Sequence, residues 1–176
     1  MIKHLNKGKQ MLKNEIIQKL NEQVVKEFYS SNLYLALSAY CNEQGLDGSG
    51  AFFFEHSKEE ADHARKIVQY LNDTDSKVVI GTIDAPKCAP KSVLEAFEIA
   101  LEHERYVTQS INDIVDFALT NKDFLTFNFL QWFVSEQLEE LVLFGDIVDK
   151  LKIIASDTNK LYLVDQYVKN LEVKRD

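Results

Sequence analysis

Four long segments with helical periodicity dominate this sequence and leave little room for any fold other than a helical bundle. Apolar residues recur every three or four positions over residues 14–42, 47–72, 91–119 and 124–153. Glycine and proline together account for only eight of the 176 residues, so few positions would interrupt helices of this length. The pattern predicts an all-α chain built from long helices.

The connections between these segments predict how the helices are ordered. The short turns EQGLDGSG and TNKD should fold the first pair and the last pair into antiparallel hairpins. The middle connection, NDTDSKVVIGTIDAPKCAP, is too long for a hairpin. A helix of about 28 residues is about 42 Å long, and about 18 extended residues can span about 60 Å. We therefore predict a four-helix bundle in which one long crossover makes the second and third helices parallel.

A short fifth helix should follow the bundle. Asp157 or Thr158 can cap its start. Its apolar stripe, which needs a packing partner, consists of Leu161, Val164, Val168 and Leu171. At this length the bundle and the fifth helix are most simply one domain.

Composition and charge narrow the possible functions. The net charge of −8 argues against a nucleic-acid backbone as partner and suits a protein that binds cations. The N-terminal residues lack the apolar run of a secretory signal, and no stretch has the roughly 18 uninterrupted apolar residues of a membrane span. Cys41 and Cys88 lie far apart without a CxxC pair. We expect a cytoplasmic protein, with a single disulfide as an open alternative.

Polar residues interrupt the apolar seam of each long helix near its midpoint. Helices of similar length in one bundle have their midpoints at one level, so these residues should meet in a single layer of the core. The spacing is also repeated, because each hairpin places a glutamate and, 33 residues later, a turn that carries two polar side chains. The residues of this layer are Glu27, Glu60, His63, Glu104, Gln137 and Glu140.

Four buried carboxylates require compensating charge, since burying even one unpaired ion costs several kcal/mol. No lysine or arginine lies on the same seams, whereas two divalent cations would balance four glutamates. Carboxylates with one imidazole favour iron or manganese. Glu60 and His63 are three residues apart on one helix and can bind the same ion. A single such glutamate is more often a protonated core residue, so the prediction depends on all six residues together.

Other polar and aromatic residues near the layer have simpler interpretations. His56 is interpreted as a core histidine with its hydrogen bonds satisfied, and His103 as an exposed residue. Tyr34 is expected to pack, with hydrogen bonding to the layer or electron donation as alternatives; Trp132 is expected to be structural. The seam is flanked by three further glutamates, for which a solvated acidic face and an auxiliary iron site are equally plausible: Glu59, Glu136 and Glu139.

With these residues identified, the chain resembles the ferritins, specifically the non-haem bacterial type, from about Met11 to Leu171. The segments that carry the resemblance are KLNEQVVKEFYSSNLY, EHSKEEADHARK, EHER and TFNFLQWFVSEQLEE. The resemblance implies one iron site at Glu27, Glu60 and His63. It implies a second at Glu60, Glu104 and Glu140 with Gln137 close by, and a third at Glu59, Glu136, Glu139 and Glu140.

The same resemblance implies an iron store with ferroxidase activity, in which Fe(II) is oxidised by dioxygen or peroxide and deposited inside a 24-subunit cage. Haem is not expected, because Gln137-x-x-Glu140 and Ala61 replace the Glu-x-x-His turn and the methionine of haem-containing bacterioferritins. Residues 1–10 extend beyond the family pattern and are predicted to form a flexible tail before a ferritin-like domain at residues 11–176, with a true start at Met11 as the alternative. The alternatives are a di-iron peroxidase or oxygenase of the rubrerythrin type and a purely structural bundle.

Overall fold

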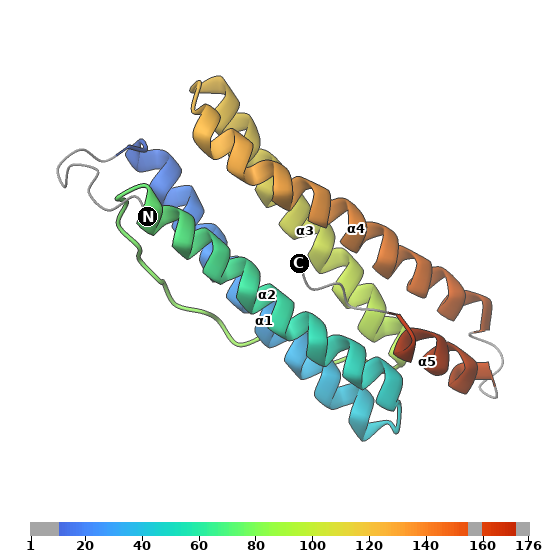
Figure 1. The fold of residues 1–176 in the computed structure, drawn as a ribbon. Coiled ribbons are helices and arrows are strands. Elements are labelled where there is room, and N and C mark those ends of the chain that lie inside the picture. Colours follow the sequence, from blue (N-terminus) through green and yellow to red (C-terminus); the bar gives the residue numbers. More distant parts are fainter. Residues whose placement is uncertain (1–10, 155–159, 172–176) are drawn as a thin grey trace.

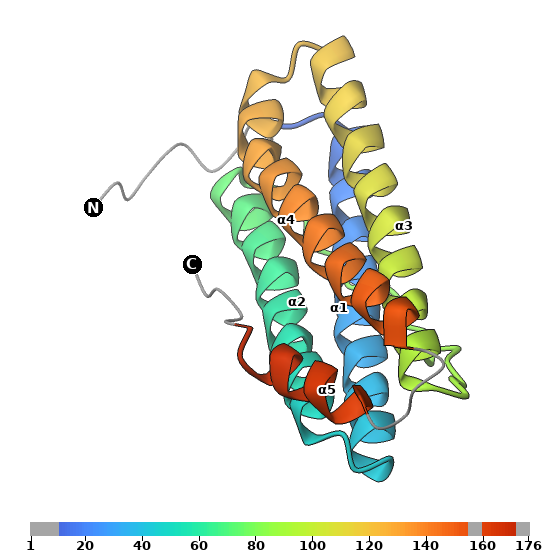
Figure 2. The ribbon, with the colours of Figure 1, turned by 90° about the vertical axis from the view of Figure 1, so that its right-hand side faces the viewer.

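The computed structural model describes residues 11–154 and 160–171, and in these it has five helices. Four long helices form a bundle, and the short fifth helix lies across one end of it (Figure 1 and Figure 2). This confirms the predicted fold, a ferritin-like four-helix bundle with a short fifth helix. The helices are α1 (Asn14–Glu43), α2 (Asp47–Asp73), α3 (Val93–Thr120), α4 (Phe124–Ile154) and α5 (Leu161–Lys169).

Two antiparallel hairpins, α1–α2 and α3–α4, are linked by the predicted crossover. Gly45 adopts a positive φ of 73° in the first turn, a conformation that glycine tolerates without strain. After α2 the chain runs back along the length of the bundle to the start of α3 (Figure 1), so that α2 and α3 point in the same direction. The extra residues of the α2–α3 connection are therefore used to cover the bundle's full length.

A serine cap fixes the start of α3 two residues later than predicted. The prediction placed the start near residue 91, whereas the helix begins at Val93. The Ser92 hydroxyl accepts a hydrogen bond from the Glu95 backbone N–H at 3.1 Å, and the Glu95 carboxylate accepts one from the Lys91 backbone N–H at 2.7 Å. Ser92 is thus the N-cap, and the return bond from Glu95 goes to the residue before it, in a variant of the capping box that pairs backbone donors at the start of the helix.

The buried apolar residues form two separate cores, one on each side of the bundle's midpoint. One core lies at the α5 end and includes the buried apolar side chains of residues 33–41, in the second half of α1. The other core, at the opposite end, includes those of residues 12–24, in the first half of α1 and just before it. Each of the other long helices likewise contributes one run of apolar residues to each core. Between the two cores, each helix presents buried polar side chains, so the predicted interruption of the seam is a property of the fold.

The face that α3 turns inward differs from the predicted one. The 3–4 spacing around Glu104 predicts that Leu94, Leu101 and Val115 lie on the buried seam of this helix, but all three are only half-buried. The adjacent row of the helix, which includes Ala96, Ala100 and Val107, is buried instead. Alanine allows close approach of a neighbouring helix, but it contributes little to an apolar pattern read from sequence. The helix is therefore rotated relative to the prediction, while its polar midpoint still faces inward.

The fifth helix docks on the start of α2 through a buried carboxylate. Asp165 accepts hydrogen bonds from the backbone N–H groups of Gly48 and Ser49, at 2.9 and 2.7 Å, and from the Ser49 hydroxyl at 2.7 Å. A Cβ atom at Gly48 would collide with the backbone oxygen of Asp165. Val164 and Val168 pack into the α5-end core, which provides the partner that the apolar stripe required. The predicted caps Asp157 and Thr158 lie outside the described residues.

Two further expectations concern the membrane and the cysteines. Among the helices of residues 11–154 and 160–171, none is long and apolar enough to cross a membrane. Cys41 is buried, Cys88 is half-buried, and both are free thiols, so the alternative of a disulfide is not realised.

Candidate metal centre

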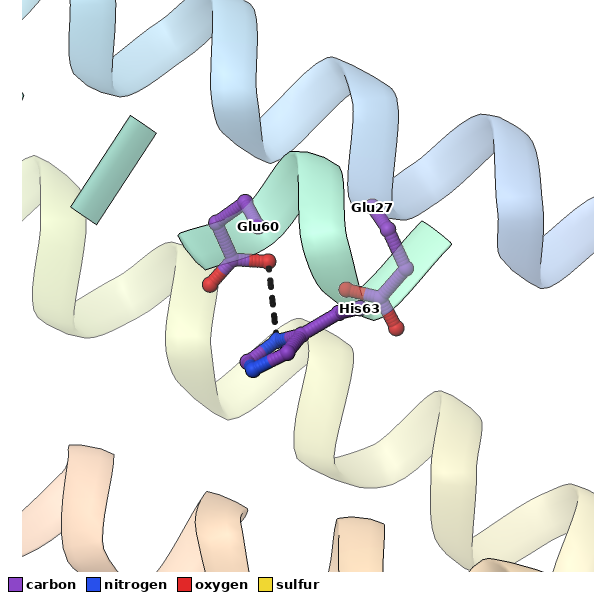
Figure 3. Close-up of side chains that lie close together, drawn as sticks. All are labelled: Glu27, Glu60 and His63. Atoms are coloured by element: carbon purple, nitrogen blue, oxygen red, sulfur yellow. Dashed lines mark ion pairs between the residues drawn. The ribbon is translucent and has the colours of Figure 1, made fainter. Parts of the chain in front are cut away.

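Three potential ligands converge between α1 and α2 at the level of the polar layer. Glu27 extends from α1, and Glu60 and His63 extend from consecutive turns of α2 (Figure 3). One ligand atom from each lies within 4.8 Å of those from the other two. His63 Nδ1 is 3.6 Å from a Glu60 carboxylate oxygen, and all three side chains are buried. The group has the size and composition to bind one metal ion.

The second hairpin supplies the other half of the layer. Gln137 Nε2 donates a hydrogen bond to the Glu104 carboxylate at 2.9 Å, which joins α4 to α3. Tyr34 of α1 donates its hydroxyl to the same carboxylate. Glu140, one turn after Gln137, is also buried. The six predicted layer residues therefore occupy one level between the two apolar cores, as their spacing in the sequence indicated.

The carboxylates of this layer are electrostatically strained when no cation is bound. Burial raises the pKa of Glu60, Glu104 and Glu140, and the charge of neighbouring carboxylates raises it further. For Glu104 the hydrogen bonds from Tyr34 and Gln137 oppose this rise. Ionised carboxylates at such a site need compensation from a positive charge. A bound cation would supply it and reverse the direction of the pKa shifts.

Three carboxylate oxygens in the layer are buried without a hydrogen-bond partner: Glu27 Oε2, Glu60 Oε2 and Glu140 Oε2. Buried polar atoms are almost always paired in native proteins, so unpaired ones require an explanation. All three belong to predicted ligands, and each could accept a bond from a metal ion. Oxygen donors with one imidazole match iron or manganese better than a metal that prefers thiolates.

We expect the stability of the metal-free protein to fall relative to that of a Glu140→Gln variant as pH rises above about 4.5. The pKa of Glu140 is raised in the folded state above its ordinary value of 4.5, so in this pH range the folded chain binds more protons than the unfolded chain. Near neutral pH the variant should be more stable by on the order of 1–3 kcal/mol, because glutamine carries no charge to bury.

Chemical denaturation from pH 4.5 to 8 in the presence of a chelator measures this difference. Adding Zn²⁺, which has no redox chemistry, should reverse the order by stabilising the wild-type protein. A metal-free wild-type protein that gains stability over the variant as pH rises would contradict the prediction.

The flanking glutamates lie on the α2–α4 side of the layer. Glu59 and Glu136 each place a carboxylate oxygen within 4.8 Å of a His63 ring nitrogen. A second group of the same size combines Glu59 with His56 and Glu140. Glu139 is exposed and lines the same surface cavity as Glu59 and Glu136. The structure thus brings Glu59 and Glu136 to the layer, while an iron site that includes Glu139 stays a prediction.

One expectation for the histidines is wrong. His103 was interpreted as exposed, but it is half-buried, and its Nε2 lies 2.7 Å from the Ser30 hydroxyl. His56 does have a hydrogen bond in the core, between Nδ1 and the Phe52 carbonyl at 3.0 Å. Its other nitrogen, however, is 3.6 Å from the Glu140 carboxylate. Burial lowers the pKa of His56 to about 4 and that of His103 to about 4, so both are neutral near pH 7.

The aromatic residues around the layer pack as expected. Tyr34 is fully buried and stacks on Phe144 with a centroid distance of 5.7 Å, in addition to its bond to Glu104. Burial and the Glu104 charge raise the pKa of the Tyr34 hydroxyl well above 10. The rings of Trp132 and His63 form a T-shaped pair with a centroid distance of 5.2 Å. Tyr34 and Trp132 therefore both help to fix the position of a predicted ligand.

Gln23 is a polar residue of the site that the seam analysis did not find. It is fully buried, and its Nε2 donates to Glu27 Oε1 at 2.8 Å. Gln23 precedes Glu27 by one helical turn, and residues four apart on a helix are neighbours. That spacing is the only sequence signal for its role, and it is a weak one, because glutamines are common in helices.

A bundle with one long crossover and a central layer of glutamates defines a ferritin-like protein, and comparison with known proteins agrees. Residues 17–154 match the family model of the ferritin-like domain, and the chain belongs to the ferritin family. It is 53% identical over 165 residues to the bacterial non-heme ferritin of Campylobacter jejuni, covering 94% of this chain and 99% of that protein. It is 42% identical to the bacterial non-heme ferritin of Escherichia coli O157:H7, covering 93% of this chain and 99% of that protein.

Solved structures give the same assignment. The fold matches an open-pore ferritin from the archaeon Archaeoglobus fulgidus with a TM-score of 0.89 and 34% sequence identity. The match covers 93% of this chain and all of that chain. The similarity thus includes the four-helix bundle and extends beyond it to nearly the whole described structure.

Proposed function

We propose that this protein stores iron and has ferroxidase activity, with the polar layer of each subunit as the oxidation site. The observation that carries the proposal is the set of three buried carboxylate oxygens, of Glu27, Glu60 and Glu140, that have no hydrogen-bond partner. They lie in a layer that also contains Glu104 and the His63 imidazole. Two Fe(II) ions are the substrate that this arrangement fits best in charge and in ligand chemistry. The relatedness to non-heme ferritins supports the same assignment.

In this proposal Glu60 is shared by the two ions. Glu27, Glu60 and His63 bind one ion, and Glu60, Glu104 and Glu140 bind the other. Each Fe(II) gives up one electron, so a pair reduces dioxygen to hydrogen peroxide, or hydrogen peroxide to water. Anionic oxygen ligands stabilise the more highly charged Fe(III) over Fe(II), which favours the oxidation.

The protein's own groups prepare the layer for this substrate. Gln137 and Tyr34 donate hydrogen bonds to Glu104, which keeps that carboxylate oriented before any ion binds. The apolar cores above and below keep water away from the ligands and so strengthen their attraction for cations. The acidic groups Glu59 and Glu136 lie beside His63 and add further oxygen ligands next to the layer.

We expect the assembled protein to be a 24-subunit shell that accumulates iron. Twenty-four copies of a 20.3 kDa chain give a mass of about 490 kDa, which light scattering measures directly. After dialysis against a chelator, aerobic addition of Fe(II) should load hundreds of iron atoms per shell. A stable dimer that oxidises Fe(II) without retaining it would favour a rubrerythrin-type enzyme. A particle that neither oxidises nor retains iron would leave only a structural role.

A further inference from the structure

A chain of three hydrogen bonds connects Lys26, at the surface, to the candidate ligand Glu27. Lys26 Nζ donates to Ser110 Oγ at 2.6 Å, and Ser110 Oγ donates to Gln23 Oε1 at 2.5 Å. Gln23 Nε2 then donates to Glu27 Oε1 at 2.8 Å. These hydrogen bonds start on α1 at Lys26, cross to Ser110 on α3 and return to α1 at Gln23. Gln23 is fully buried and Ser110 is 7% exposed, so its middle is shielded from solvent.

The donors and acceptors of these side chains allow the hydrogen bonds to run in only one direction, from Lys26 to Glu27. A lysine ammonium has donors and no acceptor, so Ser110 must accept from Lys26. The single hydroxyl hydrogen of Ser110 is then available for Gln23 Oε1. With its oxygen occupied, the Gln23 amide turns its NH₂ group toward Glu27. The reversed amide would place a carbonyl oxygen against a carboxylate, which is repulsive.

The chain also distinguishes the two oxygens of Glu27. Oε1 accepts the hydrogen bond from Gln23, whereas Oε2 is buried and has no hydrogen-bond partner. The carboxylate therefore has one oxygen committed to the protein and one oxygen free for an ion. Rotation that exchanged the two oxygens would break the bond to Gln23 or would require Gln23 to follow.

We propose that Lys26, Ser110 and Gln23 are positioning residues that hold Glu27 so that Oε2 alone binds the metal ion. The proposal rests on the proposed function, because it assigns Glu27 to the metal layer. Hydrogen bonds that orient a metal ligand are worth a factor of about 10–100 in metal affinity. Polarisation along the chain by the Lys26 charge strengthens each bond in it.

A role in packing alone makes a different prediction. The Lys26–Ser110 and Ser110–Gln23 bonds also join α1 to α3, and their loss could simply loosen the bundle. A packing role would lower the melting temperature and leave metal affinity unchanged. If these residues position Glu27, their loss should weaken metal binding only in proteins that still contain Glu27. Glu27→Ala therefore provides the decisive background for a double-mutant cycle.

The test measures binding of Zn²⁺ to the chelator-treated assembled protein by anaerobic titration calorimetry. Gln23→Met keeps the side-chain length but removes the donor, and should weaken binding by about 10–100-fold. Lys26→Met, at the half-exposed end of the chain, should give a smaller loss of the same sign. Lys26→Arg retains the donors and should restore affinity to within about threefold of wild type. In the Glu27→Ala background, Gln23→Met should have no further effect.

Ser38→Ala is the matched control for Ser110→Ala. Ser38 is also a buried serine, and its hydroxyl donates to the Gly50 carbonyl of α2 at 2.7 Å, away from the polar layer. Both variants should lower the melting temperature, but only Ser110→Ala should reduce Zn²⁺ affinity. Equal Zn²⁺ affinity in wild type, Gln23→Met and Lys26→Met would overturn the proposal, as would an undiminished effect of Gln23→Met without Glu27.

Zn²⁺ binding separates this proposal from the ferroxidase assignment, since it involves no oxidation. If the variants bind Zn²⁺ more weakly than wild type, but wild type does not oxidise Fe(II), the assignment of activity fails and the positioning role stands. If wild type oxidises Fe(II) and the Zn²⁺ affinity of the variants equals that of wild type, the positioning role fails and the activity stands.

Discussion

Replacing Glu60 with alanine is expected to abolish rapid Fe(II) oxidation while the shell still assembles. Glu60 belongs to the Glu27–His63 group, and the charges of Glu27 and Glu104 both act on its carboxylate, so it faces both halves of the layer. In the proposed arrangement its loss would leave both ions without their full set of ligands. Loss of even an outer partner costs about 10–100-fold, so we expect the initial rate to fall by more than about 100-fold. Stopped-flow absorbance after mixing with aerobic Fe(II) measures this rate.

Asp62→Ala is the matched control for this experiment. Asp62 lies on the same helix, two residues away, but is exposed and pairs with Arg65 at 2.6 Å on the outer face. Its loss should leave the rate within about twofold of wild type, because exposed ion pairs contribute little. Wild-type oxidation rates in Glu60→Ala, with a normal particle mass, would refute a shared ligand at this position.

Replacing Asp165 with alanine is expected to detach α5 from the bundle and to destabilise the subunit by about 2–4 kcal/mol. The carboxylate accepts three hydrogen bonds at the start of α2, where the helix dipole favours a negative charge. Its removal leaves the buried N–H groups of Gly48 and Ser49 without their partner. Chemical denaturation measures the loss, and hydrogen exchange at α5 shows whether this helix is released.

Gly48→Ala tests the same contact from the opposite side. The added Cβ would collide with the Asp165 backbone oxygen, so this variant should also displace α5. The two effects should be far from additive in the double variant, since they disrupt a single contact. Lys169→Ala, at an exposed position of the same helix, should change stability by less than about 0.5 kcal/mol. Fully additive losses would show that Asp165 and Gly48 act independently.

The bundle and its central layer could be predicted because each depends on regular spacing. Long helices follow from 3–4 periodicity with few glycines and prolines, and the length of the crossover decides the topology. Glu27, Glu60 and Glu104 stand out because a charged residue in the middle of an apolar seam has no favourable explanation unless it is compensated. The structure places all three in one buried layer.

Features that depend on helix rotation or on contacts between distant segments could not be predicted. Part of the inward face of α3 consists of alanines such as Ala96, which an apolar pattern barely registers. The same rotation brings His103 against Ser30 and away from solvent. The docking of Asp165 on α2 joins residues more than a hundred positions apart, and an aspartate in a short helix gives no sign of such a partner.

The division of the interior into two apolar cores has a consequence for how the sequence can change. A substitution at Leu12 or Val164 changes the packing of one core, at one end of the bundle. Substitutions that lie far apart usually have independent effects on stability. The ends can therefore diverge between relatives, or be redesigned, without readjusting the centre. A residue of the middle layer has no such freedom, because it must suit all four helices at once.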